Sequence, residues 1–161
     1  MTRLPAYRKS FFTGQDRTDG LRLELHYTSG LVYSDIIVGR AFEGYENVVH
    51  GGMLFGVLDV IMWYTILIAT KKTCMTRKTE VEFLKPVVCE APYRAQGRFL
   101  RSEGRDFWVS SWIEDAEKER CVDVVALFRE PKEIDRERLL GKLDFTGVSA
   151  EIKELFLPGT L

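Results

Sequence analysis

The chain has 161 residues, of which 45% are hydrophobic and 29% charged, and its formal net charge is −1. This length and balance predict one globular domain with its own core, and the near-neutral charge argues against nucleic-acid binding. Three cysteines without CxxC spacing and only two histidines argue against a dedicated metal site, so we expect free thiols and neither a metal nor a cofactor. The N-terminal residues contain no signal-peptide pattern, and we expect a cytoplasmic protein.

Alternating apolar and polar residues predict most of the secondary structure. We expect strands at residues 21–27, 31–42, 76–84, 93–100, 106–115 and 121–130. Short turns between neighbouring strands predict antiparallel pairing. Two short outer helices are expected at 131–143, with Pro131 at the helix start, and at 149–156.

One long apolar run separates the second predicted strand from the third. Residues 53–70, MLFGVLDVIMWYTILIAT, contain a single charge, Asp59. A membrane-spanning helix is one interpretation, but a central Asp costs about 2.5–3.5 kcal/mol to insert. A helix that is apolar on nearly every side must be covered on most of them. We therefore predict an α+β protein in which a curved antiparallel sheet wraps this helix and a second subunit covers the remainder.

Two stretches carry a resemblance to a known family. FEGYENVVHGGMLFGVLD (42–59) and TRKTEVEFLKPV (76–87) resemble signatures of hotdog-fold acyl-CoA thioesterases, in the branch that includes the phenylacetate-pathway enzymes. The resemblance extends over about residues 11–129. It implies a single hotdog domain over 1–161, with its core at about 11–130 and a C-terminal helical extension at 131–161. It also implies an acyl-CoA or acyl carrier protein thioester as substrate, a homodimer or homotetramer, and no membrane partner.

Asp59 is the principal catalytic candidate. A carboxylate in an apolar wall can activate water as a general base or attack a carbonyl directly. The amide of Gly51, at the positive end of the predicted helix, can polarise a thioester carbonyl. His50 is a candidate for orienting the acyl group or assisting the leaving thiol, with local capping as the alternative. Thr76 aligns with a position that holds the attacking water in relatives, with strand initiation as the alternative.

Further residues are candidates for substrate binding. We assign this role to Gly52, Asn47, Phe55, Met62 and Trp63, the last three as core residues that also line an acyl pocket. Many relatives carry Asn six residues before the histidine, where this chain has Gly44, so Asn47 or Glu46 would have to substitute. Candidates for binding the phosphates of coenzyme A are Lys78, Lys85, Arg94, Arg101 and Arg105.

The spacing of the motif predicts a shared site. Nine residues from His50 to Asp59 correspond to about 13 Å of helical rise and roughly half a net turn. The helix start and Asp59 of one chain should therefore point to opposite sides and meet only across a two-fold dimer. The alternative functions are a non-catalytic acyl-CoA-binding protein, another hotdog enzyme such as a dehydratase, and a purely structural domain.

Overall fold

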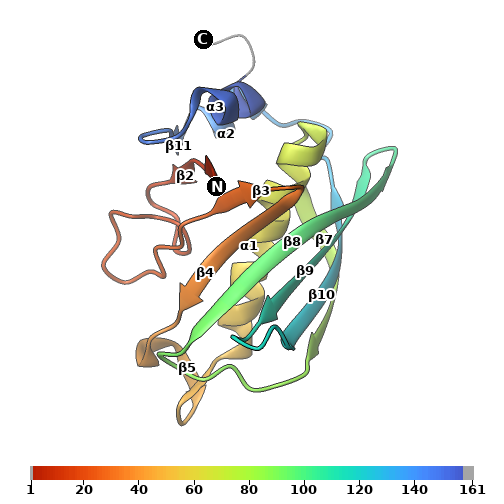
Figure 1. Ribbon diagram of the computed structural model, residues 1–161. Helices are drawn as coiled ribbons and strands as arrows, with labels where there is room; N and C mark the ends of the chain where they lie inside the picture. The colour runs from red at the N-terminus through yellow and green to blue at the C-terminus, as the bar shows by residue number, and fades with distance from the viewer. Residues whose placement is uncertain (1, 158–161) are drawn as a thin grey trace.

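The computed structural model describes residues 2–157, in which one antiparallel sheet carries a long helix, α1 (Gly51–Thr70), across one face (Figure 1). The order of the seven strands is β1 (Thr2–Arg3), β3 (His26–Thr28), β4 (Leu31–Ile37), β8 (Pro92–Glu103), β9 (Asp106–Glu114), β10 (Arg120–Arg129) and β7 (Met75–Phe83). The sheet curves around the helix, which confirms the predicted α+β hotdog architecture. All strand pairs are antiparallel, as the short turns predicted.

Helix α1 forms the centre of the hydrophobic core. By length and composition alone it could span a membrane, but more than half of its most apolar window is buried within the fold. Leu58 and Ile61 are fully buried. Gly97 of β8 permits this close packing, because a Cβ there would lie 2.7 Å from Ile61 Cγ2. The apolar run is thus a core helix against a sheet.

Strand β9 shows how the sequence pattern specifies the faces of the sheet. Phe107, Val109 and Ile113 are buried, as expected for one face of a strand that alternates with period two. Trp112, on the opposite face, is covered by the guanidinium groups of Arg98 and Arg120. The predicted division of residues 106–115 into two faces is therefore confirmed.

Two predicted strands are shorter than expected. Within 21–27 only the last two residues belong to a strand. The backbone of 21–25 is instead hydrogen-bonded to earlier residues of the N-terminal segment (residues 2–25), as in Leu23 N to Phe12 O at 2.8 Å. The expected strand 31–42 ends at Ile37 and gives way to a 3-10 turn, η1 (Arg40–Phe42). A small hairpin follows, made of β5 (Glu43–Tyr45) and β6 (Val48–Val49).

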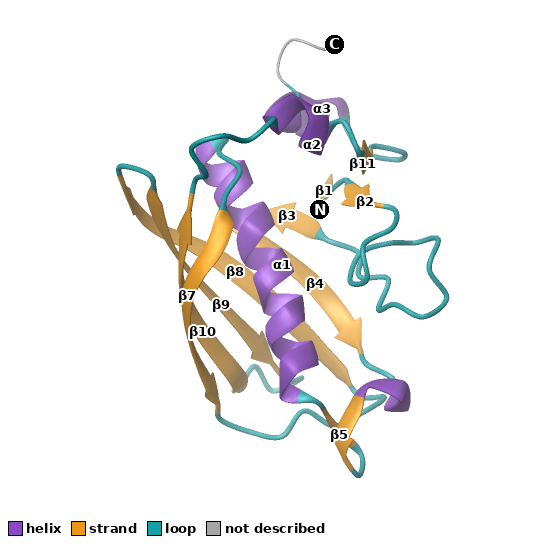
Figure 2. Ribbon diagram, turned by 180° about the vertical axis from the view of Figure 1, so that it is seen from behind, coloured by secondary structure: helices purple, strands orange, loops and turns teal. Residues whose placement is uncertain are grey.

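The C-terminal extension (described here for residues 131–157) lies at the C-terminal end of α1 (Figure 2). Its helices are α2 (Arg136–Leu140) and α3 (Ala150–Phe156), so the predicted helix start at Pro131 is wrong. Asp135 caps α2 instead, since its side chain accepts the N–H of Arg138. Strand β11 (Leu143–Asp144) pairs with β2 (Ala6–Tyr7) and joins the extension to the N-terminal segment.

Candidate active site

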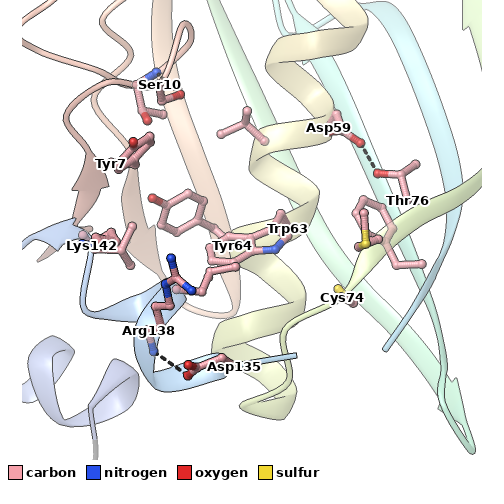
Figure 3. A pocket seen from close by; sticks show the side chains of 16 residues that line it. Tyr7, Ser10, Asp59, Trp63, Tyr64, Cys74, Thr76, Asp135, Arg138 and Lys142 are labelled. Atoms are coloured by element: carbon pink, nitrogen blue, oxygen red, sulfur yellow. Dashed lines mark hydrogen bonds between the residues drawn. The ribbon is translucent and has the colours of Figure 1, made fainter. Parts of the chain in front are cut away.

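Asp59 lies in the wall of a cavity of about 820 Å³ (Figure 3). The cavity is bounded by α1, the start of β7, the N-terminal segment and the C-terminal extension. Burial raises the pKa of the half-buried Asp59 carboxyl, and a hydrogen bond from Thr76 partly offsets this effect. The only acid of the long apolar run is therefore accessible from a cavity rather than sealed in the core.

A β-bulge in β7 brings Thr76 to this carboxylate. From Phe83 back to Thr79, every second residue of β7 lies opposite a buried residue of β10 and so faces α1. Regular alternation would make Arg77 the next such residue, but the register shifts here and places Thr76 opposite the buried Phe128. Thr76 Oγ1 consequently donates a hydrogen bond to Asp59 Oδ1 at 2.5 Å. This contact orients the carboxylate toward the sheet edge.

The predicted oxyanion-binding residues form the start of α1. His50 is the N-cap residue, and its Nδ1 accepts the N–H of Gly52 at 2.9 Å. His50 thus has the capping role considered as its alternative. Among residues 2–157 the N–H of Gly51 has no acceptor, which leaves it able to bind a substrate oxygen. The ring of Phe83 packs against this position, where a Cβ on Gly51 would lie 3.0 Å from Phe83 Cζ.

Gly51 and Asp59 of one chain are separated mainly by distance along the helix. Eight residues of helix correspond to about 12 Å of rise and a net rotation of about 80°. The expectation that Gly51 and Asp59 point to opposite sides of the helix is therefore corrected. The half turn that was predicted holds for His50, nine residues from Asp59, and not for Gly51, for which the rotation is only about 80°. The residues that line the Asp59 cavity include neither Gly51 nor its neighbours His50 and Gly52.

The hairpin before α1 leaves little room for a side chain at Gly44. A Cβ on Gly44 would lie 3.0 Å from His50 Cδ2, so a larger residue would displace the capping histidine. Asn47 adopts a left-handed backbone (φ 60°) in the turn between β5 and β6, and its carbonyl accepts the N–H of Cys89 at 3.0 Å. Asn47 does not line the cavity, so the structure gives it a part in shaping the turn.

The three predicted acyl-pocket residues have different environments. Trp63 lines the cavity one helical turn beyond Asp59 and packs edge-on against the ring of Tyr64 (Figure 3). Met62 is fully buried in the core, and Phe55 is half-buried against it. Neither of these two lines the cavity. The assignment of Met62 as an acyl contact is therefore corrected, because this side chain is enclosed within the core.

Several cavity residues escaped the sequence analysis. Burial raises the pKa of Tyr64, which follows Trp63 in the apolar run and could have been noticed there as a second polar-tipped ring. Burial, with Glu130 and Asp59 nearby, raises the pKa of Cys74 to about 12. Val60, Met75 and Phe128 also line the cavity, and the other contributors come from the two ends of the chain: Tyr7, Ser10, Thr13, Asp135, Arg138, Leu139, Lys142 and Leu143. No local pattern indicates that these segments meet.

The candidate phosphate-binding cations differ in how fully they are engaged. Four of them have partners: Lys85 with Asp115 (3.7 Å), Arg94 with Asp35 (2.7 Å), Arg101 with the ring of Trp108 (3.5 Å) and Arg105 with the carbonyl of Glu130. Within the described chain Lys78 makes no ion pair, and it lies exposed on β7 two residues from Thr76. Lys78 is thus the least engaged of the five, although it lies opposite Leu127 and so faces away from α1.

The arrangement suits polar chemistry carried out by protein side chains. It combines a carboxyl group with a raised pKa, a hydroxyl that orients it and an apolar wall that admits a hydrocarbon. Over residues 2–157 no group of three or more His, Cys, Asp or Glu residues is placed to hold a metal ion.

Comparisons with known proteins agree with this architecture. Residues 46–122, which contain His50, Asp59 and Thr76, match the family model described as the thioesterase superfamily. No curated protein sequence matches the chain. Among solved structures, a thioesterase superfamily protein is 23% identical with a TM-score of 0.72, over 76% of this chain and 61% of that protein. The present chain thus spans less than two thirds of that relative.

Two further structures share the fold. The PaaI protein of the Escherichia coli phenylacetic acid degradation operon is 13% identical, with a TM-score of 0.63 over 69% of this chain and 80% of that one. A hypothetical thioesterase from Streptococcus pneumoniae, whose structure contains coenzyme A, is 17% identical, with a TM-score of 0.61 over 67% of this chain and 87% of that one. These likenesses establish the fold, whereas the phenylacetate-pathway branch stays a prediction.

Proposed function

We propose that this chain, which matches the thioesterase superfamily from residue 46 to residue 122, is an acyl-CoA thioesterase with Asp59 as its catalytic carboxylate. The observation that carries the proposal is the raised pKa of a half-buried carboxyl in a cavity wall, hydrogen-bonded to Thr76 at 2.5 Å. A carboxylate with a raised pKa is a stronger base than one on the open surface. The coenzyme A bound to the Streptococcus pneumoniae relative supports coenzyme A as the carrier.

The proposed reaction is hydrolysis of the thioester. Asp59 takes a proton from water while the water oxygen bonds to the carbonyl carbon, and the N–H of Gly51 stabilises the resulting oxyanion. Collapse of the tetrahedral intermediate breaks the C–S bond, and the proton passes to the departing sulfur. In the alternative route the Asp59 carboxylate itself attacks, and water then hydrolyses the acyl anhydride. After one turnover in ¹⁸O-water, label on Asp59 identifies the second route, with water attacking the Asp59 carbonyl of the anhydride.

A two-fold dimer would complete this site, because Gly51 of the same chain lies about 12 Å from Asp59 along α1 and does not line its cavity. Strand β7 supports dimerisation: it is an edge strand of nine residues, next to Asp59, and its outer side has no partner within the described chain. Its ends carry the exposed apolar side chains of Met75 (65%) and Phe83 (57%). An unpaired edge of this length is a template for pairing with another chain. Pairing there would bring a second subunit next to Asp59.

A thiol-release assay on a panel of acyl-CoAs tests the catalytic assignment. We expect Asp59→Asn to lower kcat/KM by about 10²–10⁴-fold, the usual worth of a general acid–base group. Asp35→Asn removes an exposed carboxylate that pairs with Arg94 on β8 and serves as the matched control. Equal rates for wild type and Asp59→Asn would refute the assignment. Binding of acyl-CoA without turnover by the wild type would favour a non-catalytic binding protein.

Mixing two inactive variants tests whether the site is shared. Gly51→Pro removes the oxyanion-binding N–H at the first helical position, where proline is tolerated, and should cost about 10²–10³ in kcat. Gly51→Ala adds the same Cβ beside Phe83 but keeps the N–H and is the control. If Asp59 of one chain works with Gly51 of its partner, a mixture of the Asp59→Asn and Gly51→Pro proteins regains about a quarter of wild-type activity. Half of the dimers are then mixed, each with one intact site of two. A site contained within one chain predicts no recovery.

A further inference from the structure

The far end of the Asp59 cavity carries two cations that the proposed hydrolysis does not use. Arg138 and Lys142 belong to the C-terminal extension, and both line the cavity. Figure 3 shows the guanidinium group of Arg138 directed toward Trp63 and Tyr64. Among residues 2–157 neither cation makes an ion pair or a side-chain hydrogen bond. Both are therefore available to a ligand.

The segment that presents these cations is fixed to the rest of the fold. Arg136 donates hydrogen bonds to the carbonyls of Lys71 and Phe156, each at 3.1 Å. The pairing of β11 with β2 and the ion pair of Arg8 with Asp144 at 3.0 Å attach the following residues to the N-terminal segment. The backbone that carries the two cations is thus held in place relative to α1.

The wall between Asp59 and the cations is mostly apolar. Its apolar side chains include Val60 and Trp63 on α1 and Leu139 on the extension, while Ser10 and Thr13 contribute hydroxyl groups. Five residues of α1, from Asp59 to Tyr64, correspond to about 7.5 Å of rise, a length that a short acyl chain spans. The other acid of this end of the cavity, Asp135, is engaged in capping α2 through the N–H of Arg138 at 2.9 Å.

We propose that the acyl group accepted by this cavity carries an anionic group, such as a carboxylate, at the end remote from the thioester, and that Arg138 and Lys142 bind it. The inference rests on the proposed thioesterase function, because Asp59 marks the position of the reacting carbonyl. An apolar channel that ends in unpaired cations matches a hydrocarbon chain with a charged terminus. The phosphates of coenzyme A offer the same anionic chemistry, and the experiment separates the two sources.

The test compares adipoyl-CoA and suberoyl-CoA with hexanoyl-CoA and octanoyl-CoA, which match them in length but lack the terminal carboxylate. We expect the wild type to prefer the carboxylated substrates, and Arg138→Gln and Lys142→Gln each to reduce this preference by about two- to fivefold, as for contacts of exposed charged side chains. Lys132→Gln removes a cation of the extension that does not line the cavity and should keep the wild-type preference. Thermal unfolding verifies that each variant is folded.

Three outcomes would overturn the proposal. The first is a wild type that shows no preference, and the second is a preference that survives both substitutions. The third is an equal loss with all four CoA substrates that disappears with the corresponding N-acetylcysteamine thioesters, which assigns the cations to the phosphates. Calorimetric binding of the carboxypentyl-CoA and hexyl-CoA thioethers, which have six carbons each and cannot be hydrolysed, measures the same preference without catalysis. A binding preference in a protein that hydrolyses no thioester would refute the thioesterase function and leave the anion site standing.

Discussion

Replacing Asp59 with Asn should make the protein more stable while it removes activity. The carboxyl is half-buried, with Thr76 as its one hydrogen-bond partner among residues 2–157, and burial raises its pKa. An Asn side chain has nearly the same shape, carries no charge and can still accept the Thr76 hydroxyl. Burying an imperfectly compensated polar group costs about 1–3 kcal/mol, and partial exposure puts Asp59 near the lower limit. A gain of about 1 kcal/mol raises Tm by about 2–4 °C in a chain of this size.

The pH dependence of this gain follows from the sign of the pKa change. Because the pKa of Asp59 is higher in the folded than in the unfolded state, the folded protein binds this proton more tightly. Wild type therefore has its full stability below the ordinary carboxyl pKa of 3.8 and loses part of it as the pH rises through the folded-state value. The advantage of Asp59→Asn should be largest at neutral pH and should vanish in acid.

Thermal melts of both proteins across this pH range measure the effect. Asp35→Asn, which removes an exposed and ion-paired carboxylate, should show no such gain at neutral pH. An Asp59→Asn protein that is less stable than wild type at neutral pH would refute the reasoning. Asp59 would then be an ionised group that stabilises the fold. The idea that its carboxylate lowers stability and is retained for catalysis would be wrong.

Three further predictions follow from single contacts. Thr76→Val removes the hydroxyl that lowers the pKa of Asp59, so the acid limb of the kcat/KM–pH profile should move to higher pH, and an unmoved limb would contradict this role. Gly97→Ala places a Cβ 2.7 Å from Ile61 Cγ2 and should lower the free energy of unfolding by about 1–3 kcal/mol in urea titrations. An unchanged midpoint would mean that helix and sheet pack less closely than in the structure. Cys74, whose pKa is raised to about 12, should resist iodoacetamide at pH 8 in the native protein, and rapid labelling there would show that it is exposed.

The sequence predicted the elements whose pattern is local. Strict alternation around Phe107 and Val109 defined both faces of a strand, and the long apolar run predicted the central helix. The strand expected to begin at Leu21 does not form, because the N–H of Leu23 donates to the carbonyl of Phe12, a residue that is distant in sequence. Propensity and periodicity carry no information on such a partner.

The candidate site was predictable only in part for the same reason. Asp59 could be identified because a charge in an apolar run is costly, and Thr76 by its resemblance to related sequences. Arg138 and Lys142 could not be identified, because contacts between distant segments bring them to the cavity. These are the pairing of β2 with β11 and the hydrogen bond of Arg136 to the carbonyl of Lys71. Met62 was assigned to the acyl pocket although it is fully buried, because the sequence does not tell which residue next to the cavity residue Trp63 is enclosed in the core.

The extra residue in β7 has a consequence for how this chain is aligned with its relatives. Counting back by twos from Phe83 identifies Arg77 as the residue that meets the helix, whereas the residue that does so is Thr76. A gap-free alignment anchored on the FLKPV stretch would therefore assign the neighbour of Asp59 to the wrong column in any homologue without the insertion. The bulge decides which side chain of β7 meets the Asp59 carboxylate. Inserting or deleting one residue between Thr76 and Thr79 should therefore change this site more than most substitutions do.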